Sequence, residues 1–231
     1  MIKKLLKSFV NHDSNRSLAF QLRKKRAKRI MQLISDYFQK NNEVKIIDVG
    51  GTKNYWNIIP KQFLIDHHAQ ITIVNIPTSH PLPENDDVFQ FVYGDGCHLS
   101  EFRDRSFHIA HSNSVIEHVG NWANVISFVK ELRRVAETCY LQTPSYWFPI
   151  EPHFVLPFVH WLPKYLRIKM LQYFGLGTRS KEREYNHARI IIESYNLMTA
   201  RQLKKLFPNA ELFKEKFLLF TKSLIIVDCD H

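Results

Sequence analysis

The sequence predicts an α/β fold, with a mostly parallel β-sheet that ends in an antiparallel C-terminal hairpin. Short β-branched runs alternate with helical patterns between residues 44 and 143, which is typical of βαβ units around a parallel sheet. The first run, Val44–Val49, is followed by Gly50 and Gly51. Glycines at this position let main-chain N–H groups approach a ligand, and a nucleotide-like cofactor binds at this edge of such sheets.

Length and composition indicate one globular domain. The chain has 231 residues, 45% of them hydrophobic, and no apolar run approaches the roughly 18 residues that would span a bilayer. Its three cysteines, Cys97, Cys139 and Cys229, are far apart, so they predict neither a disulfide framework nor a cysteine metal site. We therefore expect a cytoplasmic protein, either fully soluble or peripheral at the inner face of the membrane.

The positive charge is concentrated at the N-terminus. Residues 1–30 hold ten Lys and Arg and one acid, which is +9 of the net charge of +10, so the rest of the chain is nearly neutral. A nucleic-acid-binding domain would carry its own basic stripe, so we do not expect nucleic acid as a partner. Residues 1–40 are predicted to form a basic helical arm. It either contacts an anionic membrane surface or packs as an ordinary N-terminal helix.

The predicted elements of the first part of the chain follow from hydrophobic spacing. Residues 16–40 are predicted to be helical because apolar side chains recur at helical intervals. Residues 54–65 are predicted to hold a short helix and loop interrupted by Pro60, and residues 121–137 an amphipathic helix. Five strands are predicted, at 44–49, 71–76, 88–93, 107–112 and 138–142.

Residues 144–190 break this alternation. Prolines interrupt the segment repeatedly and nine aromatic residues crowd positions 144–174, so we expect an insertion that covers the crevice, here called the lid. Beyond it, residues 199–207 are predicted to be a helix with Thr199 as its N-cap. A hairpin of strands 212–220 and 223–227 ends the chain, with its turn at Thr221–Lys222. Residues 41–231 are thus predicted to form a single domain with a lid.

Four motifs stand at the ends of the predicted strands. They are Asp48–Gly51 after the first, Asn75 at the second, Gly94–Asp95 after the third and Phe107–Val119 across the fourth. This set resembles the class I S-adenosylmethionine-dependent methyltransferases, in particular the type 11-like members. The resemblance implies a Rossmann-like, doubly wound sheet of seven strands and S-adenosylmethionine as cofactor. The further run Gln142–Phe154 is similar to a bacterial subgroup associated with surface-polysaccharide genes.

The resemblance also implies a set of cofactor-binding residues. The set is Asp48, Gly50, Gly51, Asn75, Asp95, Gly96, Ser112 and Asn113. Asp95 matches the residue that accepts a hydrogen bond from the adenine amino group. Asn75 stands where the family usually carries an acid that binds both ribose hydroxyls. An amide accepts a hydrogen bond without charge assistance, so we expect weaker cofactor binding or help from another residue.

The residues after the fourth strand are candidates for the chemistry. His118 is predicted to be the general base, because an imidazole with a pKa of about 6.5 suits removal of a hydroxyl proton at neutral pH. His153 in the lid is a second acid/base or acceptor-binding candidate, and Glu117 and Trp147 are predicted to bind the substrate. Some relatives hold a divalent metal with an acid at the position of Ser114. Because that acid is missing here, no metal is predicted.

These expectations point to an O-methyltransferase acting on a sugar or another small hydroxylated metabolite. A lipid-linked acceptor in surface-glycan biosynthesis is a hypothesis that rests on the basic arm and the aromatic lid. A carboxylate acceptor would need no base and would favour a nearby cation such as Arg179 or Arg183. Two other classes stay open, namely an RNA methyltransferase that uses the arm for phosphate contacts and a non-catalytic binding protein with the same fold.

Overall fold

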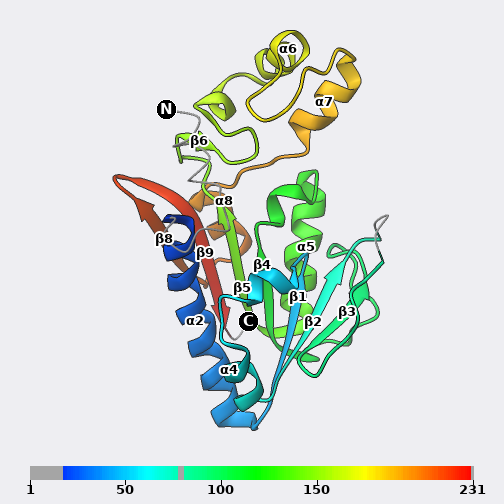
Figure 1. Cartoon of the computed structure of the whole chain (residues 1–231), viewed down its shortest axis with the longest axis vertical. Helices are drawn as coiled ribbons and strands as arrows, with labels where there is room; N and C mark the ends of the chain where they lie inside the picture. The colour runs from blue at the N-terminus through cyan, green and yellow to red at the C-terminus, as the bar shows by residue number, and fades with distance from the viewer. Residues whose placement is uncertain (1–17, 78–80, 230–231) are drawn as a thin grey trace.

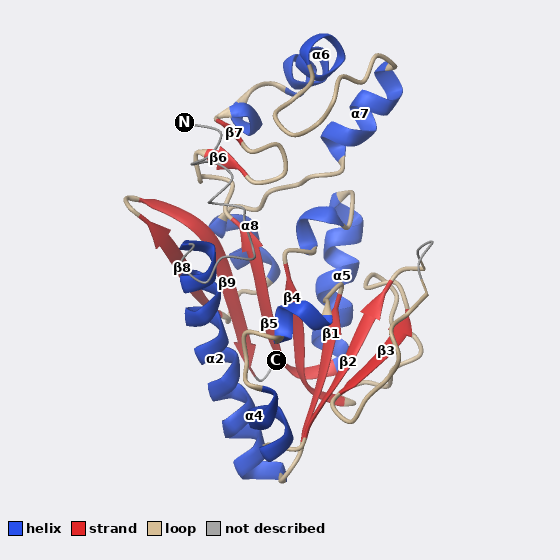
Figure 2. Ribbon diagram, in the orientation of Figure 1, coloured by secondary structure: helices blue, strands red, loops and turns tan. Residues whose placement is uncertain are grey.

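A seven-stranded sheet forms the centre of the molecule, as predicted (Figure 2). The computed structural model describes residues 18–77 and 81–229, so the first 17 residues of the predicted arm lie outside it. The strand order is β3-β2-β1-β4-β5-β9-β8, in which β1 to β5 are parallel and β9 and β8 are antiparallel. The strands are β1 (Val44–Val49), β2 (Ala69–Asn75), β3 (Phe89–Tyr93), β4 (Phe107–Asn113), β5 (Ala136–Pro144), β8 (Glu211–Phe217) and β9 (Phe220–Cys229).

Helices cover both faces of this sheet, because neighbouring strand residues point to opposite sides. Ile46 packs into one cluster with Ile30 of α2, and Ile47 packs into another with Phe128 of α5. The helices along the sheet are α2 (Leu18–Asn41), α3 (Lys53–Trp56), α4 (Lys61–Asp66), α5 (Trp122–Val135) and α8 (Ala200–Leu206). None of the helices in the described part of the chain is both long and apolar enough to cross a bilayer.

The predicted helix boundaries agree with the structure where the local signals are strong. Pro60 separates α3 from α4 and precedes the first residue of α4. Thr199 caps α8, and Gln202 completes a capping box by bonding back to it. These signals are short-range, and the structure confirms them.

The predicted turn of the C-terminal hairpin was wrong. Lys216 pairs with Thr221 and Phe217 with Phe220, so the turn is formed by Leu218 and Leu219 rather than by Thr221–Lys222. Leu218 adopts a φ of 53°, a backbone conformation that glycine or asparagine usually occupies, so the sequence carries no turn signal at this position. The apolar side chains made these residues resemble strand interior, yet they are 78% and 93% exposed.

The lid forms a small lobe with its own core beyond the carboxyl ends of the parallel strands (Figure 1). It contains β6 (Ile150–Glu151), β7 (Leu156–Pro157), the 3-10 turn η2 (Val159–Trp161), α6 (Lys164–Phe174) and α7 (Tyr185–Glu193). Phe154, Ile168 and Leu171 are buried at its centre. Since β5 leads into the lobe, its residues stand over the edge of the sheet where the predicted site residues gather.

Candidate functional site

The loop after β1 has no room for side chains. Gly50 has a φ of 75°, and its N–H donates to the carbonyl of Val74 over 2.8 Å. A Cβ on Gly50 would lie 2.6 Å from Val115 Cγ2, and one on Gly51 would lie 1.7 Å from Asp48 Oδ2. Both positions therefore require glycine, because the loop is packed tightly from the side of the protein.

Asp48 supports this loop from beneath, which corrects its predicted place among the groups that touch the cofactor. Its side chain is fully buried. Oδ2 accepts a 2.7 Å hydrogen bond from Trp56 Nε1, and Oδ1 lies 2.6 Å from His111 Nδ1. His111 Nε2 in turn lies 3.2 Å from the Tyr55 hydroxyl. A buried carboxylate needs such partners, so this chain of bonds holds the loop in place.

The residues that follow β2 and β3 lie at the same edge of the sheet. Asn75 Nδ2 donates to the carbonyl of Gly51 over 3.0 Å. Because its nitrogen is engaged, its Oδ1 is the atom with which Asn75 would accept from a ribose hydroxyl. Asp95 Oδ1 accepts from the N–H of Cys97 over 2.9 Å, which shapes the turn around Gly96.

The end of β4 supplies Ser112 and Asn113. The Ser112 hydroxyl is buried and donates to the carbonyl of Val49 over 3.1 Å, so its contacts are structural. Asn113 Oδ1 accepts from Arg26 Nη1 over 2.8 Å, and the same nitrogen lies 3.0 Å from Gln142 Oε1. An arginine of α2 therefore reaches the carboxyl ends of β4 and β5.

Arg26 was not predicted as a site residue. It is 8% exposed, and its Nε forms a 3.0 Å ion pair with Glu215 Oε1. It was expected only as one of the cations of the basic helical arm of residues 1–40. Arg26 precedes the buried residues Ile30 and Ile34 by four and eight positions, and residues at this spacing lie on the same face of a helix. This spacing could have placed Arg26 on the buried face of α2.

The two predicted catalytic histidines meet. His118, in the 3-10 turn η1 (Ile116–His118), has its Nε2 3.2 Å from the Nε2 of His153. His153 Nδ1 lies 2.6 Å from Oε1 of Glu151, a buried carboxylate whose Oε2 accepts from the N–H of Phe154. The ring of Tyr195 stacks on His153 with 4.1 Å between centroids. The pair is thus held by the lid on one side and by the end of β4 on the other.

Glu117, which was predicted to bind the substrate, is fully buried. Its Oε2 accepts a 2.8 Å hydrogen bond from the Thr143 hydroxyl, and its Oε1 has no hydrogen-bond partner among the described residues. Burial raises the pKa of Glu117 to about 7. The pKa of His118 is lowered to about 4, chiefly by loss of hydration and then by the charge of His153.

The same cluster offers atoms to a divalent cation. One ligand atom each from Glu117, His118 and His153 lies within 4.8 Å of the others. The sequence predicted no metal because Ser114 replaces an acid, but the third group here comes from a loop 35 residues beyond His118. The arrangement can therefore serve either proton transfer or cation binding.

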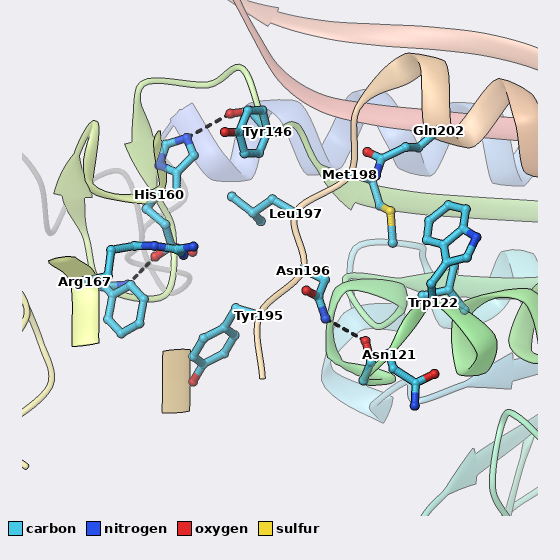
Figure 3. A pocket seen from close by; sticks show the side chains of 14 residues that line it. Asn121, Trp122, Tyr146, His160, Arg167, Tyr195, Asn196, Leu197, Met198 and Gln202 are labelled. Carbon is cyan, nitrogen blue, oxygen red and sulfur yellow. Dashed lines mark hydrogen bonds between the residues drawn. The ribbon is translucent and has the colours of Figure 1, made fainter. Parts of the chain in front are cut away.

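A cavity of about 240 Å³ lies between the lid, the start of α5 and the segment before α8 (Figure 3). Glu151 and Tyr195 line it and also contact His153. Trp147, which was predicted to bind the substrate, does not line this cavity; its ring is 61% exposed, and its neighbour Tyr146 lines the wall instead. Adjacent residues of this irregular segment point to different sides, and the sequence pattern does not indicate which.

Comparisons with known proteins agree with this architecture. Residues 64–138 match the family model of a methyltransferase domain. None of the curated proteins matches the chain. A SAM-dependent methyltransferase from Archaeoglobus fulgidus superimposes with a TM-score of 0.50 at 9% identity, covering 90% of this chain and 92% of that one.

Two further solved structures are similar. The CMeT domain of the citrinin polyketide synthase has a TM-score of 0.51 at 10% identity, over 81% of this chain and 46% of that one. The methyltransferase domain of bacterial CtHen1 has a TM-score of 0.49 at 16% identity, over 87% and 97%. At such identities the likeness concerns the fold, which is the predicted Rossmann-like arrangement.

Proposed function

We infer that this chain is an S-adenosylmethionine-dependent methyltransferase that methylates a hydroxyl oxygen of a sugar or another small hydroxylated metabolite. The observation that carries the inference is the contact between His118 and His153, 3.2 Å between their Nε2 atoms, beside the lid cavity. A hydroxyl acceptor must lose its proton as the new C–O bond forms, and this pair supplies groups for that proton.

The cofactor supplies a methyl group on a sulfonium, which is a good leaving group, so the protein chiefly orients the acceptor and excludes water. The residues that would hold it are the glycine loop at Gly50 and Gly51, with Asn75 and Asp95 at the neighbouring strand ends. Their position at one edge of the sheet supports this assignment.

The hydrogen bonds of the histidine pair suggest a route for the proton. With Nδ1–H of His153 donated to Glu151, the Nε2 lone pair of His153 accepts from Nε2–H of His118. The acceptor hydroxyl gives its proton to the other ring nitrogen of His118, and Nε2–H passes to His153. The lowered pKa of His118 favours handing the proton on. The positive charge then rests on His153, next to the Glu151 carboxylate.

Replacing His118 or His153 by Ala tests this function. Transfer of a radiolabelled methyl group to a panel of free, phosphorylated and lipid-linked sugars should fall by roughly 10²–10⁴-fold. Calorimetric binding of S-adenosylmethionine should be unchanged. His187→Ala, on an exposed part of α7, is the matched control. If both variants keep wild-type turnover, the proton is not taken by this pair.

The other two classes have less support. An RNA methyltransferase would need the cations of α2 for phosphate contacts, but Arg26 is buried and Arg29 lies 3.6 Å over the ring of Phe213. A non-catalytic binding protein would not need a paired histidine cluster at the cavity. Calorimetry with S-adenosylmethionine and its demethylated product separates this class, because absence of heat at high ligand concentration would favour it.

We also propose peripheral contact with an anionic membrane, which a lipid-linked acceptor would require. The basic arm was the predicted contact, and its first 17 residues lie outside the described structure. Support comes instead from the hairpin turn, where Leu218 and Leu219 are exposed between Lys216 and Lys222. In co-sedimentation with anionic vesicles, the wild type and the control Ile190→Ser should be found in the pellet. A smaller fraction of the double variant Leu218→Ser/Leu219→Ser should be found there. Equal, negligible pelleting of all three would contradict the proposal.

A further inference from the structure

The lid cavity contains a cation that has no ion-pair partner among the described residues. Arg167 of α6 lines it, and the guanidinium is half-buried. Its Nε is buried without a hydrogen-bond partner among the described residues, where Arg167 also forms no ion pair, and the nearby Glu151 carboxylate acts on it through its charge alone. Burial lowers its pKa, which reflects the free energy that the charged form loses away from water. A charge partly removed from water with a buried, unsatisfied donor is favoured by a bound acceptor, so Arg167 indicates a place for an anion.

The single carboxylate that lines the cavity among the described residues, Glu151, forms neither a hydrogen bond nor an ion pair with Arg167. Glu151 uses Oε1 for His153 and Oε2 for the N–H of Phe154. The two lid arginines that were expected near a carboxylate acceptor, Arg179 and Arg183, are placed differently. Arg179 bonds to the Tyr195 hydroxyl, and neither Arg179 nor Arg183 lines the cavity.

A second polar atom of the wall is also unused. His160 is 6% exposed, and its Nε2 lies 2.8 Å from the carbonyl of Tyr146, so the proton is on Nε2 and Nδ1 is an acceptor. That Nδ1 is buried and has no partner in the described part of the chain. Burial lowers the pKa of His160, in agreement with a neutral ring. The wall therefore offers a cation at Arg167 and a hydrogen-bond acceptor at His160, with the aromatic ring of Tyr146 beside them (Figure 3).

We propose that the lid cavity binds an acidic sugar, with its phosphate or carboxylate at Arg167 and a ring hydroxyl at His160. This inference rests on the proposed function, because it names the acceptor class for the same site. Tyr195 lines the cavity and stacks on His153, so a ring held here stands next to the histidine pair. The anionic group of the acceptor binds to Arg167, and the atom that is methylated is a hydroxyl oxygen elsewhere on the sugar.

The test measures binding without methyl transfer. Inorganic phosphate, glucose 1-phosphate, glucuronate and glucose are titrated into the full chain, Arg167→Met and the control Arg183→Met, at constant ionic strength. The wild type and the control should bind at least one of the charged sugars on the order of 10–100-fold more tightly than glucose, as one charge-assisted hydrogen-bonded contact provides. Arg167→Met should lose that preference. The titrations with glucose 1-phosphate and glucuronate distinguish a phosphate from a carboxylate. The titration with inorganic phosphate measures how tightly an anion binds at Arg167 when no sugar ring is present.

Folding of the variant is checked separately. Because Arg167 has no hydrogen-bond or ion-pair partner among the described residues, Arg167→Met should unfold at the same temperature as the wild type or higher when no anion is present. Arg167→Gln, which keeps hydrogen bonding without the charge, should lose the same preference. Equal affinities for glucose and both charged sugars, or an unchanged preference in both variants, would overturn the acidic-sugar proposal. Such a result would leave S-adenosylmethionine binding and the effect of His118→Ala standing, so it is distinguishable from failure of the proposed function.

Discussion

Replacing Glu117 by Gln should make the protein more stable at alkaline pH. The Glu117 side chain is fully buried, one of its oxygens has no partner among the described residues, and burial raises its pKa from 4.5 to about 7. Because the folded-state pKa is the higher one, the folded protein keeps a proton that the unfolded chain releases between these values. The free energy of unfolding therefore falls as pH rises through that window, and the loss is complete above about pH 7.

The size of the effect follows from the shift. A pKa difference of one between the folded and unfolded states corresponds to about 1.4 kcal/mol. The raised pKa of Glu117 therefore lowers the free energy of unfolding by roughly 3 kcal/mol at pH 8 and by less than about 1 kcal/mol at pH 5. Gln has nearly the same shape, keeps an oxygen for the Thr143 hydroxyl and does not ionise. Any penalty from its amide nitrogen is the same at both pH values, so the change between pH 5 and pH 8 isolates the charge.

Urea denaturation of wild type and Glu117→Gln at the two pH values measures this difference. The free energy of unfolding of the variant relative to wild type should increase by roughly 2–3 kcal/mol from pH 5 to pH 8. Glu101→Gln, at an exposed position, is the control and should show no such change. A pH-independent difference between Glu117→Gln and wild type would refute the reasoning, because it would mean that Glu117 ionises at its ordinary pKa.

Three further outcomes are expected. Gly51→Ala should lower the free energy of unfolding in denaturant titrations by about 1–3 kcal/mol, because its Cβ would lie 1.7 Å from Asp48 Oδ2. The same variant should show no binding of S-adenosylmethionine in calorimetry. Binding as in the wild type would argue against the packed loop. Thr199→Ala should remove the cap of α8 and cost about 1 kcal/mol by the same titrations, and no loss would mean the capping box contributes nothing. Treatment with a chelator should leave methyl transfer unchanged if His118 and His153 act on a proton; loss of activity restored by a divalent cation would assign the cluster to metal binding.

The glycine loop shows how much of the site the sequence can indicate. Gly50, Gly51, Asn75 and Asp95 each end a strand whose hydrophobic run is visible in the sequence. Parallel strands place their carboxyl ends at one edge, so these residues were expected together and are found together. The direction of each side chain was harder to predict. Asp48 belongs to the same motif, but it points inward to its buried partners.

The contacts that concern chemistry join segments far apart in the chain. His118 comes from η1, which follows β4, and His153 comes from the lid, and nothing in their spacing indicates that they touch. Arg26 reaches Asn113 across 87 residues, and Arg167 faces a cavity whose opposite wall belongs to α5 and the segment before α8. Such contacts depend on the packing of whole elements, which local propensity does not encode.

By itself the sequence determined the α/β alternation, the glycine loop, the cap at Thr199 and the family resemblance, because each depends on residues within a few positions of one another. Only the tertiary structure decided that Glu117 is buried, that His153 completes a pair with His118 and that the buried Nε of Arg167 has no hydrogen-bond partner in the part of the chain that the structure describes. Burial and long-range contact set the charge state and the reach of a side chain, and both arise only when distant segments exclude water from the same small volume.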